Sequence, residues 1–201
     1  MLKKIILSLS FLFFQACSTF LIGDHPNLPS AIPEINKEVT YELIGWKEGV
    51  SKKYASEILR TIHLSGTFKK ISQHTKYDSE IKIQIILEKA PRLSLLFGEQ
   101  SQPVTWGLEK EPGKFSLYIL NRILTYRTFF IVPILQKSSD RVVFRVWKWN
   151  QKVAEYSYTI RNVQAIGWVS LGLLFFDDRD KIEDLYSNYA KQFLSDSQSV
   201  Y

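Results

Sequence analysis

Apolar residues recur at every third or fourth position in two stretches of the chain, and each stretch predicts an amphipathic helix. The first stretch follows Gly49, and Gly66 stands where such a helix would end. The second begins at Asp177. The apolar positions are Val50, Tyr54, Ala55, Ile58, Leu59 and Ile62 in the first stretch, and Ile182, Leu185, Tyr186, Tyr189 and Phe193 in the second. A further helical segment is expected over residues 116–126.

Alternation of apolar and polar positions predicts strands between these helices. The clearest half-buried strand begins at Ile81, with Ile83, Ile85 and Leu87 on the same face. Residues 141–149 and 152–163 predict an antiparallel hairpin that turns at Asn150 and Gln151. Val142, Phe144 and Val146 share one face of the first strand, and Ala154, Tyr156, Tyr158 and Ile160 share one face of the second. Residues 39–46 and 68–74 are further strand candidates, and residues 91–113, punctuated by Pro and Gly, predict a loop.

The order of these elements predicts the fold class. A strand, a helix, further strands, a hairpin and a final helix favour an α/β fold of the α+β sandwich kind. We expect a mixed or antiparallel sheet with two amphipathic helices packed on one face. A single globular domain is expected over residues 38–196, with residues 197–201 as a tail.

The amino terminus carries an export signal. Lys3 and Lys4 supply a positive start, and residues 5–14 are apolar apart from Ser8 and Ser10. As a helix this run would rise about 15 Å, which is half the hydrocarbon thickness of a bilayer. Residues 1–16 are therefore expected to be a signal peptide that does not span the membrane.

The residues that follow this run resemble the lipobox of bacterial lipoproteins. Ala16 and Cys17 match the lipobox, whereas Phe14 and Gln15 depart from its usual form. The resemblance implies cleavage before Cys17, a thioether-linked diacylglycerol on its sulfur and a fatty acyl group such as palmitate on the new amino terminus. The alternatives are an ordinary cleaved signal with an incidental cysteine, or an uncleaved anchor. Ser18 after the cysteine favours the outer over the inner membrane.

Residues 17–37 predict a tether between the acylated cysteine and the domain. Pro26, Pro29 and Pro33 interrupt the segment, and no apolar period is visible. Because Phe20, Leu21, Ile22 and Leu28 are apolar, the segment has a second interpretation, in which it clamps back onto the domain.

Charge and cysteine use narrow the functional class. The formal net charge is +6, and the basic residues are scattered, which favours a solvated surface over a nucleic-acid partner. Cys17 is the only cysteine, so the chain can form no internal disulfide. No nucleophile, phosphate-binding or dinucleotide motif is present, so we expect no catalytic residue, no cofactor and no metal site. Asp177, Asp178 and Asp180 are interpreted as acids at a helix amino terminus rather than as calcium ligands.

Four residues are candidates for an interaction surface. Trp147, Trp149 and Arg145 alternate onto one strand face, and these residue types are frequent at protein interfaces. Core packing or cross-strand stabilisation is the competing interpretation. Trp168 lies in the uncharged segment 165–176, which is expected to be a buried sheet edge or loop. The alternative is that it rests in a membrane interface.

The pattern after residue 38 resembles a group of small bacterial lipoproteins that are similar to the amino-terminal domain of TolB and its relatives among envelope assembly lipoproteins. The resemblance rests on the turn that ends in Ile131, Val132 and Pro133, the charged hairpin, the Trp-containing segment and the last helix. It implies a non-enzymatic, membrane-anchored lipoprotein that docks onto another envelope protein or onto peptidoglycan. The alternative is a carrier of a lipid or small apolar ligand, in which residues 129–135 and 165–176 line a cavity.

Overall fold

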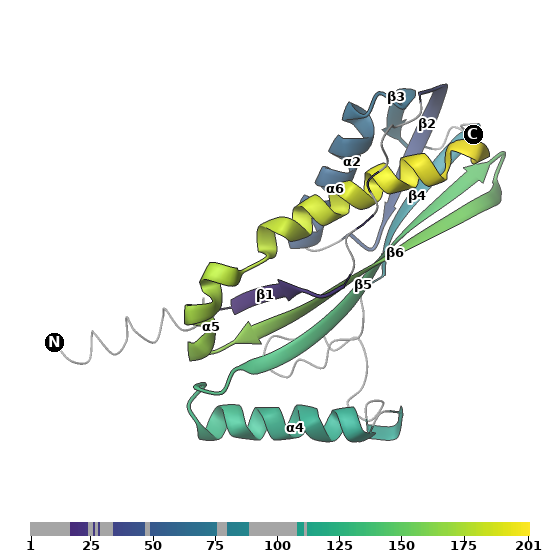
Figure 1. The fold of residues 1–201 in the computed structure, drawn as a ribbon. Helices are drawn as coiled ribbons and strands as arrows, with labels where there is room; N and C mark the ends of the chain where they lie inside the picture. Colours follow the sequence, from purple (N-terminus) through teal and green to yellow (C-terminus); the bar gives the residue numbers. More distant parts are fainter. Residues whose placement is uncertain are drawn as a thin grey trace. The chain divides into compact units, whose positions relative to one another are not determined.

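The computed structural model of the chain describes residues 17–23, 26, 28, 34–46, 49–75, 80–88, 108–110 and 112–201 (Figure 1). The strands are β1 (Cys17–Leu21), β2 (Ile35–Ile44), β3 (Phe68–Gln73), β4 (Ile81–Glu88), β5 (Ile134–Lys148) and β6 (Gln151–Ile166). The helices are α2 (Gly49–Leu64), α4 (Pro112–Arg127), α5 (Trp168–Leu173) and α6 (Arg179–Asp196), with short 3₁₀ helices at Leu174–Phe176 and Gln198–Val200.

These strands form one mixed sheet in the order β1-β6-β5-β4-β2-β3. Strand β2 is parallel to both β3 and β4, whereas β4 is antiparallel to β5, and β1 is antiparallel to β6. The predicted fold class, an α+β arrangement with a mixed sheet, is confirmed. Most of the predicted loop 91–113 lies outside the described residues.

The chain divides into two compact units. Unit 1 comprises Met1–Ile22, Ala90–Ser139 and Arg161–Arg179, and unit 2 comprises Gly23–Lys89, Asp140–Ile160 and Asp180–Tyr201. Unit 1 therefore holds β1, α4, α5, the first residues of β5 up to Ser139 and the last residues of β6 from Arg161 onward. Unit 2 holds the rest of β5 and β6 and the remaining elements. That residues 38–196 form a single domain stays a prediction.

The core of unit 2 lies between the sheet and helices α2 and α6, which Figure 1 shows side by side. Phe144 of β5 stacks on Phe193 of α6, with ring centroids 4.3 Å apart, and both are fully buried. Tyr54 of α2 stacks on Tyr186 of α6 at 4.5 Å, which joins the two helices. Both predicted helices are confirmed, and Gly66 follows α2 with a φ of +66°, the left-handed conformation that ends many helices.

The hairpin between β5 and β6 is confirmed, but its turn falls one residue earlier than predicted. Trp149 and Asn150 are the turn residues, with φ values of 47° and 62°, and Gln151 begins β6. A two-residue turn of type I′ needs positive φ at both central positions, and Asn tolerates this conformation better than Gln does.

The expected tether and tail are both more structured than predicted. Residues 17–21 form β1, and β2 begins at Ile35, so strands occupy both ends of the expected tether. β1 is held because it pairs with the last residues of β6, from Cys17 opposite Ile166 to Leu21 opposite Asn162. In the expected tail, Ser197 is buried and the ring of Tyr201 packs edge-on against Phe68.

Candidate functional site

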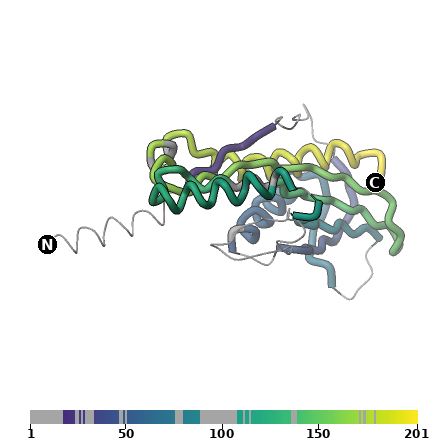
Figure 2. Tube along the Cα trace, turned by 90° about the horizontal axis from the view of Figure 1, so that it is seen from below, coloured from purple at the N-terminus to yellow at the C-terminus, as the bar shows by residue number. Residues whose placement is uncertain are grey.

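The predicted lipid-attachment residue, Cys17, is the first residue of β1. Its backbone pairs with Ile166 at the end of β6, and β1 starts beside α5 (Figures 1 and 2). The next residue, Ser18, is fully buried, and its hydroxyl donates a hydrogen bond of 2.8 Å to the carbonyl of Ser170. An acyl group on Cys17 would therefore be attached to an ordered strand of the sheet rather than to a free linker.

β1 is an edge strand, and two carboxylates cover its outer edge. The amide of Thr19 donates to Oδ1 of Asp177 at 2.9 Å, and the amide of Leu21 donates to Oδ2 of Asp178 at 3.1 Å. The carbonyl of Thr19 accepts from the amide of Asp178 at 2.8 Å. These bonds satisfy edge groups that would otherwise be open to a further strand.

Two of the three acidic residues therefore do not have the role at a helix amino terminus that the sequence predicted for them. Asp177 and Asp178 bind β1, and Asp180 is the acidic residue in the first turn of α6. The sequence pattern could not distinguish these cases, because the partner amides lie far away along the chain.

An apolar tip lies next to the start of β1 in unit 1. It consists of Phe129, Ile131, Trp168, Val169, Phe175 and Phe176, all of which are exposed, with Phe129 at 82% and Phe175 at 91%. Within residues 165–176, the expectation of a buried edge or loop is wrong for the side chains of Trp168, Val169, Phe175 and Phe176. The segment forms α5 and a 3₁₀ turn, which are too short to turn every apolar side chain inward.

The two halves of the tip are joined through hydrogen bonds from Trp168 to two backbone carbonyls. The amide of Trp168 donates to the carbonyl of Phe130 at 2.9 Å, and its indole Nε1–H donates to the carbonyl of Phe129, also at 2.9 Å. Gly167 makes this approach possible, because a Cβ at its position would lie 2.7 Å from the carbonyl oxygen of Phe130. Phe129 and Phe130 have φ values of 48° and 63°, and such non-glycine conformations cost on the order of 1–3 kcal/mol each.

Helix α4 has an inverted distribution of polar and apolar side chains. Leu117, Leu120, Ile123 and Leu124 form an exposed leucine-rich stripe, with Leu117 at 67% exposure. On the opposite side Arg122 and Thr125 are buried.

The side chain of Asn121 fixes the end of α4 to the start of β5. Its Nδ2 donates to the carbonyl of Pro133 at 2.9 Å, and its Oδ1 accepts from the amide of Leu135 at 3.1 Å. Sequence reasoning predicted a helix here but did not identify the stripe, because periodicity alone does not show which face is covered.

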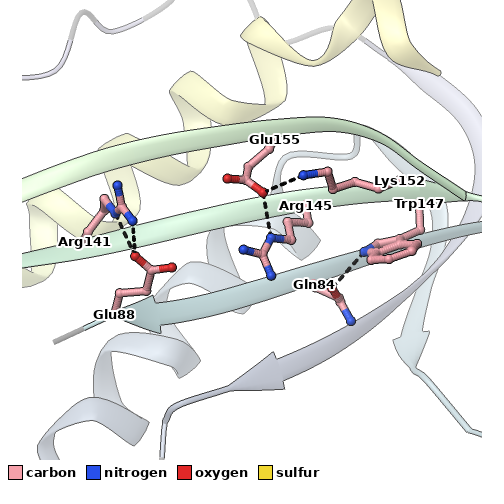
Figure 3. A network of polar contacts seen from close by, with 7 residues as sticks. All are labelled: Gln84, Glu88, Arg141, Arg145, Trp147, Lys152 and Glu155. Atoms are coloured by element: carbon pink, nitrogen blue, oxygen red, sulfur yellow. Dashed lines mark hydrogen bonds and ion pairs between the residues drawn. The ribbon is translucent and has the colours of Figure 1, made fainter.

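The face of β5 that carries Arg145 and Trp147 forms a polar lattice with its neighbours (Figure 3). The indole Nε1–H of Trp147 donates to Oε1 of Gln84 at 2.8 Å, and the ammonium of Lys82 lies 5.4 Å from the indole ring centroid. Arg145 donates to Glu155 at 2.7 Å, and Lys152 lies 3.2 Å from the same oxygen. Arg145 and, secondarily, Lys152 hold the pKa of the Glu155 carboxyl below its usual value. These contacts match the competing interpretation, cross-strand stabilisation.

The other two tryptophans of the candidate surface lie elsewhere. Trp149 is 72% exposed in the hairpin turn of unit 2, and Trp168 belongs to the tip in unit 1. Trp149 therefore lies in the turn beyond the polar lattice, and Trp168 is described with unit 1. Their role in binding a partner stays a prediction.

The described residues contain no candidate metal centre. No group of three His, Cys, Asp or Glu side chains gathers among them in a way that could hold a metal ion. A depression of about 450 Å³ on unit 2 is lined by polar residues that include Lys37 and Glu80, which pair with each other at 3.3 Å. Within the ranges that the structure describes, no helix has both the length and the hydropathy that crossing a bilayer requires.

The residues expected to line a carrier cavity are largely exposed where the structure describes their side chains. Phe129, Ile131, Leu135, Phe175 and Phe176 are all exposed to solvent. That residues 129–135 and 165–176 line a ligand cavity stays a prediction.

Comparison with known proteins gave fold-level likenesses only. No protein-family model and no curated protein matches the chain. Among solved structures, it is similar to a DUF330 protein of Xanthomonas campestris, at 10% identity and a TM-score of 0.38 over 86% of this chain and 89% of that one.

Two further similar structures are named as lipoproteins. A minor lipoprotein of Acinetobacter baumannii has 12% identity and a TM-score of 0.39, covering 82% of this chain and 95% of that one. Rare lipoprotein B of Shewanella oneidensis has 9% identity and a TM-score of 0.40, covering 82% and 96%. None of the three is named as a TolB-like protein, and at these scores the likenesses carry no argument about function.

Proposed function

We propose that the protein is a non-enzymatic lipoprotein of the bacterial envelope that is anchored through Cys17 and docks onto another envelope protein through helix α4. The observation that carries the docking proposal is the leucine-rich stripe of Leu117, Leu120, Ile123 and Leu124, which is exposed although these residue types usually lie inside. The lipobox and the export signal support the anchor.

The stripe favours a protein groove as its partner. Leu117, Leu120 and Leu124 follow the spacing of three and then four residues by which an amphipathic helix fills an apolar groove. Branched apolar side chains suit such a groove better than they suit the polar glycan strands of peptidoglycan. Ser18 after the cysteine favours the outer over the inner membrane, and we propose that the domain lies on its periplasmic face.

Metabolic labelling with a palmitate analogue tests the anchor. We expect the label on the wild-type protein and its loss in Cys17→Ala, together with release of the variant from the membrane fraction. Unlabelled wild-type protein from its native cells would remove the anchor from the proposal.

Photo-cross-linking in native cells tests the docking surface. A photoreactive phenylalanine analogue placed at Leu120 should give one discrete adduct with an envelope protein, and the adduct should weaken when Leu124→Glu is added. Leu64 is the matched control, because it is an exposed leucine, at 73%, near the end of α2. Equal adduct patterns from the two positions, or no reproducible adduct from Leu120, would contradict docking through α4.

A further inference from the structure

The apolar tip has no role in the docking proposed for α4, yet it lies beside the anchor residue. We propose that the tip of Phe129, Ile131, Trp168, Val169, Phe175 and Phe176 inserts into the phospholipid leaflet that holds the acyl chains of Cys17. This inference rests on the acylation proposed above and adds a second membrane contact to it.

The first support is the position of the tip relative to Cys17. Cys17 pairs across the sheet with Ile166, and partners in antiparallel strands have Cα atoms about 5 Å apart. Gly167 and Trp168 follow Ile166 directly, and Ser18 bonds to Ser170. The acyl chains would therefore enter the membrane next to the tip, and this tethering makes its contact with the same leaflet intramolecular.

The second support is the absence of charge from the tip. Residues 128–136 and 162–176, which supply both halves of the tip, contain no Asp, Glu, Lys or Arg. Charged side chains are costly in hydrocarbon, so this composition permits insertion. Arg127 and Arg161, both exposed, stand just outside the two segments, where they suit anionic lipid headgroups.

The third support is the way in which the tip satisfies its polar atoms. The indole N–H of Trp168 donates to the carbonyl of Phe129, and the amide of Trp168 donates to the carbonyl of Phe130. Groups that bond within the protein lose little on leaving water, whereas unsatisfied backbone groups in lipid are costly. Trp168 has the amphipathic ring that is enriched at membrane interfaces, and Phe175 and Phe176 supply the apolar area beside it.

Spin-label depth measurement on the acylated full-length protein tests this inference. Cys17 is the only cysteine of the chain, so once it is acylated an introduced cysteine is the only free thiol. Phe175→Cys, Val169→Cys and Ile131→Cys each place a label on the tip. Leu64→Cys places one on an apolar position of unit 2 whose exposure, 73%, falls within the range of the three tip positions. The proteins are bound to vesicles of phosphatidylethanolamine and phosphatidylglycerol.

The expected result is a shift of the tip labels toward collision with oxygen and away from a water-soluble nickel chelate, with no such shift at Leu64→Cys. Aqueous exposure of all three tip labels on an acylated, vesicle-bound protein would overturn the inference and leave the anchor standing. If the tip labels become shielded only when envelope proteins are added, the tip is a protein-docking surface and the inference is wrong. Absence of the palmitate label from Cys17 would remove anchor and inference together.

Discussion

In unit 2 the large apolar side chains fill the interior, whereas in unit 1 most of those that the structure describes face outward. Among the described buried apolar residues, only Ile134 and Ala165 belong to unit 1. Its buried positions are instead held by polar residues that make hydrogen bonds, such as Ser18, Thr19, Thr125 and Ser170.

This difference fits the docking proposed above, in which the two units would have separate roles. Burial of apolar area is the main favourable term in folding, so unit 2 has the composition of a stability core. Exposed apolar area contributes nothing to folding but becomes favourable when a partner or a membrane covers it. Unit 1 thus has the composition of a binding element, and mutations should separate the two roles.

The largest expected effect comes from truncating a ring in the core of unit 2. Phe193→Ala should lower the free energy of unfolding by about 3–5 kcal/mol, because the fully buried ring stacks on Phe144 and leaves a cavity. The matched change Phe175→Ala in unit 1 should lie within about 0.5 kcal/mol of wild type, because that ring is 91% exposed. Denaturant unfolding followed by circular dichroism measures both, and similar losses would break the distinction between the units.

A smaller but still marked effect is expected at Gly167, where the two halves of the tip meet. Gly167→Ala should cost about 2 kcal/mol or more, since the new Cβ would meet the Phe130 carbonyl at 2.7 Å in a conformation unfavourable for L-residues.

Gly66→Ala is the control for this substitution, because Gly66 also has positive φ but no atom within 4 Å of the added Cβ. It should cost about 1 kcal/mol. Hydrogen exchange of the Trp168 amide should accelerate in Gly167→Ala alone. Equal exchange in the two variants would show that close packing at Gly167 does not hold the tip.

The sequence predicted those elements whose formation depends on neighbouring residues, and it missed those that depend on residues far away along the chain. α2, α6 and β4 were predicted because their apolar residues repeat with the helical or strand period over adjacent residues. β1 was missed because it is short, and because its partners, Ile166 on one edge and Asp177 on the other, are supplied by a distant part of the chain.

The candidate site follows the same rule. Cys17 was predicted as the attachment residue because the lipobox is a local motif, and its acylation stays a prediction. Trp168 drew attention because its segment lacks charge. Phe129 and Trp168 join only through hydrogen bonds in the folded chain, so no sequence period could link them. The outward face of α4 was unpredictable for a related reason: an exposed leucine stripe has the same periodicity as a buried one.

The next effect concerns the edge of β1. The double change Asp177→Ala with Asp178→Ala should lower stability by about 1.5–3 kcal/mol, because two bonds from backbone amides to carboxylates are lost. Hydrogen exchange of the Thr19 and Leu21 amides should become faster. Asp180→Ala serves as the control, because Asp180 lies in the first turn of α6. If the amides exchange equally fast in both variants, the carboxylates do not hold β1.

A pH-dependent effect is expected within unit 2. Burial and, secondarily, the hydrogen bond from Tyr158 to Asp196 at 2.8 Å raise the pKa of the Tyr158 hydroxyl above its ordinary value. A raised native pKa means that the stabilising contribution is present below the unfolded pKa of about 10 and is lost as pH rises above it. Tyr158→Phe should cost about 1 kcal/mol near neutral pH and should lessen the fall in stability at high pH. Parallel wild-type and variant curves above pH 10 would contradict this account.

The smallest effect is expected at the hairpin turn of unit 2. Trp149 is a non-glycine residue with a φ of 47°, and Asn populates this conformation more readily than Trp. The indole of Trp149 is largely exposed and the residue lies in the turn, so Trp149→Asn should raise the free energy of unfolding by up to about 1 kcal/mol. Trp147→Asn is the matched change. It should lower the free energy of unfolding, because it removes a half-buried ring that is bonded to Gln84. Thermal unfolding of the two variants measures the contrast. A loss of stability in Trp149→Asn would show that this exposed ring contributes to folding, and would weaken the assignment of exposed apolar residues to binding.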